Sequence, residues 1–186
     1  MTGGVISQAG EAEILARVRG GESAAYGELV VLHAQVAKRT AVFLGAGADA
    51  DDVVQESFVK AYRALGSFRT GAAFRPWLLR IVANETRNVL RSRSRRSHRE
   101  ELAAPLDVVL DPAEHAVSLE RRRELLEAVR SLPESFRLVV TCRYLLDLDE
   151  QETAVVLGWP RGTVKSRLHR ALGRLRDSLP DKEVQR

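Results

Sequence analysis

A basic stretch near the end of the chain carries side chains that can contact nucleic acid. Residues 161–170 read Arg-Gly-Thr-Val-Lys-Ser-Arg-Leu-His-Arg. Arginine and lysine bind phosphates and guanine, and serine hydroxyls contact either. On a helix, one face would carry Arg161, Lys165, Ser166, Arg167, His169 and Arg170. The alternative is a solvated helix whose charged face has no ligand.

The residues around this stretch favour a helix-turn-helix. A helix-turn-helix requires a small packing residue, an apolar contact residue and a turn-forming residue. The sequence supplies these, in order, as Ala154, Leu157 and Gly158. Glycine fits the turn because it adopts a positive φ without a Cβ clash. Pro160 suits the start of the second helix, where its missing amide hydrogen costs little. We therefore expect two helices within residues 149–176, the second reading a major groove of DNA.

Acids and an amide share one face of another expected helix, residues 49–65. Asp52 and Glu56 are one helical turn apart, as are Asp51 and Gln55. Such a face can bind a protein partner. Because acids in a first turn also stabilise a helix through its dipole, a purely structural role stays open.

Aromatic, amide and basic side chains surround a loop of small residues at 67–75. Phe68 and Phe74 lie in this loop, and Trp77 lies where Pro76 is expected to open the next helix. Aromatic platforms and amide donors suit unstacked bases. The alternative is that these rings anchor a core. The helix then presents a basic face made of Arg80, Asn84, Arg87 and Arg91.

Composition indicates an all-α fold of two small helical domains joined by a flexible linker. The 186 residues are rich in Leu, Val, Ala, Arg and Glu, and no strand-like alternation is present. We expect helices at residues 11–19, 22–44, 49–65, 76–96, 111–131 and 134–146, followed by the helix pair. The domains span residues 11–97 and 119–179, and residues 98–118, with Pro105 and Pro112, form the linker.

Local signals also predict where these helices begin, end and face the core. Ser23 or a neighbouring residue is expected to cap the start of the second helix. Asp49 is expected to cap the start of the third helix, and Gly66 is expected to follow its end. The second helix would bury Leu29, Leu32, Val36 and Phe43, among others. Residues 1–10 and those from Pro180 onward are expected to be disordered.

Charge and cysteine content narrow the class of protein. The net charge is +4, and arginine concentrates in residues 87–99 and 161–176, which suggests two contacts with one polyanion. The single cysteine, Cys142, excludes an intrachain disulfide and a cysteine-based zinc site, and we expect a buried, inert thiol. With no signal peptide and no long apolar run, we expect a cytoplasmic protein without membrane contact.

No pattern predicts catalysis. The four histidines (His33, His98, His115 and His169) lie in unrelated surroundings, without a HExxH-type pair, a nucleophile elbow or a phosphate-cradling loop. We expect neither enzymatic activity nor a cofactor or metal.

In this order and separation, the motifs resemble the extracytoplasmic-function (ECF) class of bacterial RNA polymerase sigma factors of the sigma-70 family. Asp52-Val-Val-Gln-Glu56 and the Phe68–Asn84 block resemble region 2, and residues 132–171 resemble region 4. The sequence departs from the family at Glu150, Thr153 and Trp159-Pro160, where an aromatic, an aliphatic and an aliphatic-serine pair are usual.

The resemblance implies a subunit that directs core RNA polymerase to specific promoters and initiates transcription. The polymerase clamp would contact Asp51, Asp52, Gln55 and Glu56. The −10 strand would contact Phe68, Arg69, Phe74, Arg75, Trp77, Arg80, Asn84, Arg87, Asn88 and Arg91. The −35 duplex would contact Arg161, Thr163, Lys165, Ser166, Arg167 and Arg170.

The implied partners are core RNA polymerase, through its clamp and flap regions, promoter DNA and, as for many members of the class, an anti-sigma protein. The alternative function is a stand-alone helix-turn-helix regulator of duplex DNA. That alternative explains residues 149–176, but it explains neither the acidic face nor the Phe68–Asn84 block, which contains Trp77. It also predicts a dimer that binds two half-sites.

Overall fold

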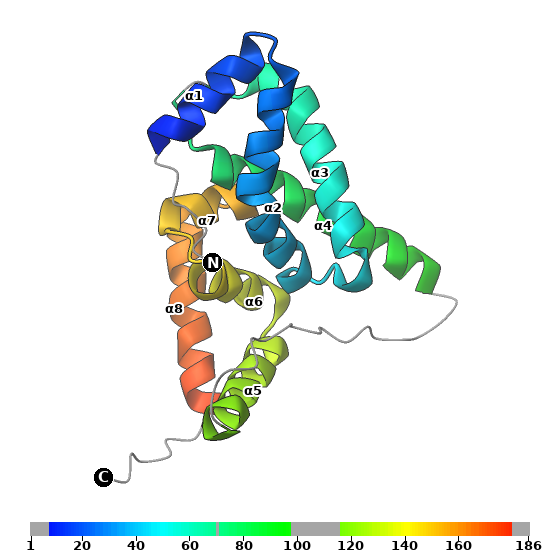
Figure 1. Cartoon of the computed structure of the whole chain (residues 1–186). Coiled ribbons are helices and arrows are strands. Elements are labelled where there is room, and N and C mark those ends of the chain that lie inside the picture. Colours follow the sequence, from blue (N-terminus) through cyan, green and yellow to red (C-terminus); the bar gives the residue numbers. More distant parts are fainter. Residues whose placement is uncertain (1–7, 70, 98–115, 180–186) are drawn as a thin grey trace. The chain divides into compact units, whose positions relative to one another are not determined.

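A computed structural model describes residues 8–69, 71–97 and 116–179, and within these ranges the chain forms helices and no strand. Contacts divide the chain into two compact units, Met1–Asp107 (unit 1) and Val108–Arg186 (unit 2). The predicted all-α fold with two helical domains is confirmed (Figure 1). The predicted linker lies outside the described residues up to 115, and residues 116–118 already belong to a helix.

Unit 1 is built from four α-helices. They are α1 (Gln8–Arg19), α2 (Tyr26–Phe43), α3 (Ala50–Ala64) and α4 (Phe74–Ser97). Helices α2, α3 and α4 each contact the other two, and α1 packs on α2 (Figure 1). Their common core includes Leu29, Val53, Phe74, Leu78 and Val82. Three mutually packed helices thereby fix the outer faces of α3 and α4, which carry the candidate residues.

Helix α2 differs from its prediction at its start and in its buried face. The chain first makes a 3₁₀ turn, Ser23–Ala25, and no side-chain cap forms at Ser23. The core receives Tyr26, Leu29, His33, Ala37, Thr40 and Ala41. Leu32, Val36 and Phe43, which we expected in the core, are only partly buried. The small side chains of Ala37 and Ala41 allow close helix approach, and this packing overrides the longer apolar residues.

Asp49 and Gly66 occupy the predicted N-cap and C′ positions of α3, but neither makes the expected capping interaction. The carboxylate of Asp49 makes no cap hydrogen bond and instead pairs with Arg93 of α4 at 2.6 Å. Gly66 lies within a 3₁₀ turn, Leu65–Ser67, and does not adopt a positive φ. A charged partner from another helix therefore outcompetes the local cap of Asp49, since it offers a full charge.

Two helices of unit 1 begin earlier than predicted. Helix α4 starts at Phe74, so Pro76 lies within its first turn, where no intrahelical amide donor is required. Helix α1 includes Gln8–Gly10, which we expected to be disordered. Residues 1–7 and 180–186 lie outside the described residues.

Unit 2 contains α5 (Ala116–Ser131), α6 (Glu134–Val140), α7 (Glu150–Leu157) and α8 (Arg161–Ser178). The helix predicted for residues 134–146 is α6 followed by a π turn, Thr141–Leu145. Helix α8 contacts α5, α6 and α7, and the core includes Val139, Leu148, Val156 and Val164. Cys142 is fully buried, and burial raises the pKa of its thiol to about 12, which confirms the predicted buried thiol.

None of the helices in the described parts of the chain combines the length and the apolar character needed to cross a bilayer.

Candidate protein-binding and nucleic-acid-binding surfaces

The predicted helix-turn-helix consists of α7, a short turn and α8. Helix α7 begins with a capping box: the Asp149 carboxylate accepts the Glu152 amide at 2.7 Å, and the Glu152 carboxylate accepts the Asp149 amide at 2.9 Å. Gly158 ends α7 with a φ of 69°, the left-handed conformation expected of this residue. Pro160 immediately precedes α8. The capping box fixes the start of α7, whereas Gly158 and Pro160 fix the two ends of the turn and hence the direction of α8.

Helix α8 separates a core stripe from a polar stripe. Val164, Ala171 and Leu175 are buried. The predicted contact residues all lie outside this stripe: Arg161, Lys165, Ser166 and Arg170 are exposed, and Thr163 and Arg167 are partly buried on its flank. The arrangement can present basic and hydroxyl groups to a DNA groove.

Two of the unusual residues in this helix pair contact basic side chains of α8. The guanidinium carbon of Arg167 lies 4.1 Å from the centre of the Trp159 ring. The Nε of Arg161 donates to the Glu150 carboxylate at 3.3 Å. We did not predict a functional role for Trp159 from the sequence. The presence of tryptophan at a position where an aliphatic residue is usual was the feature that could have indicated one.

The third unusual residue, Thr153 of α7, points into the core. Its side chain is fully buried, and its hydroxyl has no hydrogen-bond partner among the described residues. A buried hydroxyl without a partner destabilises the fold.

Helix α4 presents the predicted polar face of unit 1. Arg80, Asn84, Asn88 and Arg91 are exposed, and Arg87 is partly buried. Arg87 donates to the side-chain oxygen of Asn84 at 2.8 Å, and Asn88 donates to Glu85 at 3.3 Å. The face therefore offers positive charge and amide groups that are already ordered along the helix.

The aromatic residues beside this face mostly belong to the core. Phe74 is 0% and Phe68 5% exposed, so in this structure neither ring has a face free for a base. This supports the core-anchor alternative for both. Trp77 is partly exposed and packs on both rings, with centroids 4.8 Å from Phe68 and 5.5 Å from Phe74. Trp77 is thus the one of the three rings that the structure leaves accessible, with Arg69 exposed and Arg75 partly buried nearby in the chain.

Helix α1 braces the loop that carries Phe68. The guanidinium of Arg19 donates to the Phe68 carbonyl and lies 5.7 Å from the centre of its ring. The loop start is therefore held by a contact from a helix distant in sequence, which no local pattern indicated.

The predicted acidic face of α3 is exposed along its whole length. Asp51, Asp52, Gln55 and Glu56 all face solvent. Lys38 of α2 lies 2.7 Å from Asp51, and Lys60 lies 3.4 Å from Glu56 and 2.6 Å from Glu85. The face therefore carries acids within a network of ion pairs. The pairs of Lys38 with Asp51 and of Lys60 with Glu56 are exposed and contribute little to stability in water.

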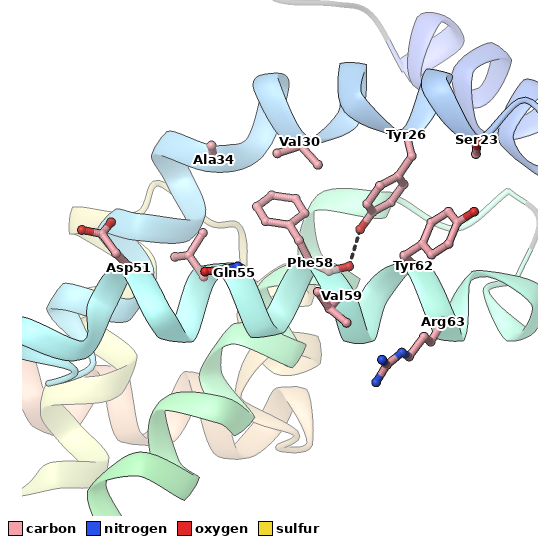
Figure 2. A pocket seen from close by; sticks show the side chains of 11 residues that line it. Ser23, Tyr26, Val30, Ala34, Asp51, Gln55, Phe58, Val59, Tyr62 and Arg63 are labelled. Carbon is pink, nitrogen blue, oxygen red and sulfur yellow. Dashed lines mark hydrogen bonds between the residues drawn. The ribbon is translucent and has the colours of Figure 1, made fainter.

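An apolar groove runs between α2 and α3 beside this acidic face (Figure 2). Its volume is about 680 Å³, and Asp51 and Gln55 lie at one end. At its floor the Tyr26 hydroxyl donates to the Phe58 carbonyl at 2.7 Å, and burial raises the pKa of this hydroxyl. The apolar lining includes Val30, Ala34, Val54, Phe58, Val59 and Tyr62. An apolar groove with a polar end suits a helix of a protein partner. We did not predict this groove from the sequence.

The fold and the face of α8 define a helix-turn-helix DNA-binding protein, and comparison with known proteins places it in a family. Residues 28–96 match Sigma-70 region 2, and residues 122–175 match Sigma-70 region 4. The ECF RNA polymerase sigma-E factors of Salmonella typhimurium and Escherichia coli are 37% identical over 169 residues, covering 85% of this chain and 88% of each relative. The chain belongs to the ECF class of sigma-70 family RNA polymerase sigma factors.

Two solved structures share the fold. CnrH, in complex with the cytosolic domain of CnrY, superposes with a TM-score of 0.65 and 28% identity, covering 88% of this chain and 93% of that one. The sigma factor RpoE of Bartonella quintana, in complex with the anti-sigma factor NepR, superposes with a TM-score of 0.69 and 24% identity, covering 85% of this chain and 98% of that one.

Proposed function

We propose that this sigma factor joins core RNA polymerase through α3, reads the −35 duplex with α8 and holds the opened −10 strand on α4. The single observation that carries this proposal is the pair of exposed basic faces, one on α4 in unit 1 and one on α8 in unit 2. A protein that binds duplex DNA alone needs only the second face.

The geometry of α8 supports the proposed −35 contacts. Ser166 and Arg170 lie near the middle of its exposed face, opposite Val164 and Ala171. Side chains there reach base edges when such a helix enters the major groove, whereas flanking residues reach phosphates. Each good bidentate base contact contributes about 1–3 kcal/mol of discrimination.

The −10 contacts combine the polar face of α4 with Trp77. Arg80, Asn84, Asn88 and Arg91 supply charge and amide donors, and the accessible side of Trp77 supplies a stacking surface. Stacking contributes about 1–3 kcal/mol per base, which offsets a cost of a few kcal/mol for extruding a base from the duplex. Phe68 and Phe74 support this surface from below.

The polymerase contact is the acidic face of α3 together with the adjacent groove. Asp52, Gln55 and Glu56 can pair with basic and amide groups of the polymerase clamp, while the groove receives apolar side chains. RNA synthesis itself is chemistry of the polymerase, and we assign this chain no catalytic group. CnrH, which is 28% identical, is bound to a second protein, so a protein regulator is a further proposed partner.

The deciding experiment is run-off transcription on sheared genomic DNA with core RNA polymerase from the source organism. The wild type is compared with Asp52→Arg, Glu56→Arg and the double variant, and Glu13→Arg, an exposed acid of α1, serves as the control charge reversal. We expect discrete transcription starts that the control keeps and the double variant loses.

Two other outcomes would change the proposal. Tight binding of the protein alone to duplex DNA, with no starts, would favour a stand-alone regulator. Starts that survive the double charge reversal would keep promoter recognition and reject α3 as the polymerase contact.

A further inference from the structure

The turn of the helix-turn-helix contains a tryptophan where an aliphatic residue is usual, and this ring supports an arginine of α8. The Arg167 guanidinium carbon lies 4.1 Å from the centre of the Trp159 ring. We propose that Trp159 is a positioning residue for promoter binding, holding the Arg167 guanidinium against the flank of α8 where it meets a phosphate of the −35 duplex. This inference rests on the proposed function of α8.

The position of Arg167 on α8 indicates a phosphate rather than a base. Arg167 is partly buried at the edge of the polar stripe, whereas its neighbour Ser166 and Arg170 are exposed near the middle. When the middle of a helix faces the floor of the major groove, its edges face the sugar-phosphate walls. Arg167 is therefore placed to bind the backbone, which fixes the register of the base contacts.

The ring holds the arginine without neutralising it. A cation–π contact leaves the guanidinium charged, and its N–H donors can still bind a ligand. Arg161 shows the contrast, since its Nε donates to the Glu150 carboxylate. A side chain that is ordered before binding loses less conformational entropy on binding, so the stack strengthens the contact.

The neighbouring residues fix the main chain of Trp159. Gly158 adopts the left-handed conformation, the Trp159 amide donates to the Ala154 carbonyl at 3.1 Å, and Pro160 follows with a φ of −59°. The residue that carries the ring is thus fixed from both sides. The Trp159-Pro160 pair, which lacks the usual serine, thereby has a role in positioning Arg167.

The test compares Trp159→Leu, Trp159→Phe, Arg167→Ala and the Trp159→Leu/Arg167→Ala double variant in the full chain bound to core polymerase. Affinity for a promoter fragment found by run-off transcription is measured across salt concentrations. We expect Trp159→Leu to weaken binding about two- to fivefold and Trp159→Phe to retain most of it. Arg167→Ala should lower the slope of log K against log salt by about 0.9, because one phosphate contact is lost. The double variant should bind no more weakly than Arg167→Ala.

A matched control is the other cation–π pair of α8. The Arg174 guanidinium lies 5.1 Å from the Phe136 ring, and Arg174 is outside the predicted contact set. Arg174→Ala should therefore leave the salt slope closer to the wild-type value than Arg167→Ala does. The NMR resonance of the Arg167 Hε provides an independent readout in the free protein, with a ring-current shift expected in the wild type and Trp159→Phe but not in Trp159→Leu.

Several results would overturn the inference. If the losses of binding free energy in Trp159→Leu and Arg167→Ala add up in the double variant, the ring has only a structural role. A missing ring-current shift in the wild type would lead to the same conclusion. Promoter binding that is unaffected by Trp159→Leu would remove this inference and leave the proposed function intact. Failure to find any transcription start would instead remove the proposed function and the phosphate role with it.

Discussion

The polar face of α4 and the polar face of α8 are supported by different kinds of side chain. Beneath the first lie aromatic rings, Phe68 and Phe74, and only Trp77 reaches the surface. Beneath the second lie small and aliphatic residues such as Val164 and Ala171, and every predicted contact stays outside the core. Aromatic rings bury large apolar areas, so packing them in the core stabilises the fold and leaves them inaccessible to a ligand. An aromatic residue beside a loop is therefore weaker evidence of a binding site than an arginine on a helix.

The largest effect is expected from Phe74→Ala, which removes an aromatic ring from beneath the polar face of α4. Because the ring is fully buried, we expect the free energy of unfolding of unit 1 to fall by about 3–5 kcal/mol. Urea denaturation followed by Trp77 fluorescence, in a Trp159→Phe background, reports this transition because the chain holds two tryptophans.

The conservative change Phe74→Leu separates the two roles of this position. A core role predicts that Phe74→Leu keeps most of the stability and the promoter opening. Normal stability of Phe74→Ala combined with loss of promoter opening would show instead that the ring contacts DNA.

For α8, the corresponding change is Arg170→Ala. Arg170 is exposed, so its loss should leave the unfolding of unit 2 unchanged. Loss of a base contact should lower initiation at promoters with a −35 element by about 1–3 kcal/mol, or roughly five- to 150-fold. Multi-round transcription from matched promoters with and without the element measures the effect, and equal rates of wild type and variant on both promoters would reject Arg170 as a −35 contact.

A smaller effect distinguishes the cores of the two units. Thr153→Val replaces a buried hydroxyl that has no partner among the described residues, and we expect it to stabilise unit 2 by about 1 kcal/mol. Thr86→Val in unit 1 is the matched control, because the equally buried Thr86 hydroxyl donates to the Val82 carbonyl at 2.9 Å and its loss should destabilise by a similar amount. Urea denaturation of both variants measures the change in the free energy of unfolding, which should be opposite in sign for the two. A destabilised Thr153→Val would mean that this hydroxyl is hydrogen-bonded in solution.

The sequence predicted a helix most accurately where its apolar residues occupy a single face. The polar face of α8 and the left-handed Gly158 were predictable because periodicity and backbone conformation are local properties. Helix α2 was less predictable, since apolar residues occur on several of its faces and Val31 is 84% exposed. Its buried face depends on how closely Ala37 lets a neighbouring helix approach.

Long-range contacts account for most of what was missed. Asp49 is a good cap by type, but Arg93, 44 positions later, binds it instead. The groove between α2 and α3 exists only once the two helices have packed. The contact of Trp159 with Arg167 similarly required the direction of α8, although both residues were conspicuous in the sequence.

The π turn at the end of α6 has a consequence for the length of the chain. In this turn the Leu146 amide donates to the Thr141 carbonyl at 3.0 Å, a five-residue step in place of the four-residue step of an α-helix. Deleting one residue from Thr141–Leu145 would restore α-helical spacing and rotate the following chain by about 100°. Leu146 and Leu148, both buried, would then leave the core. In this stretch the packing of unit 2 depends on the number of residues as well as on their types.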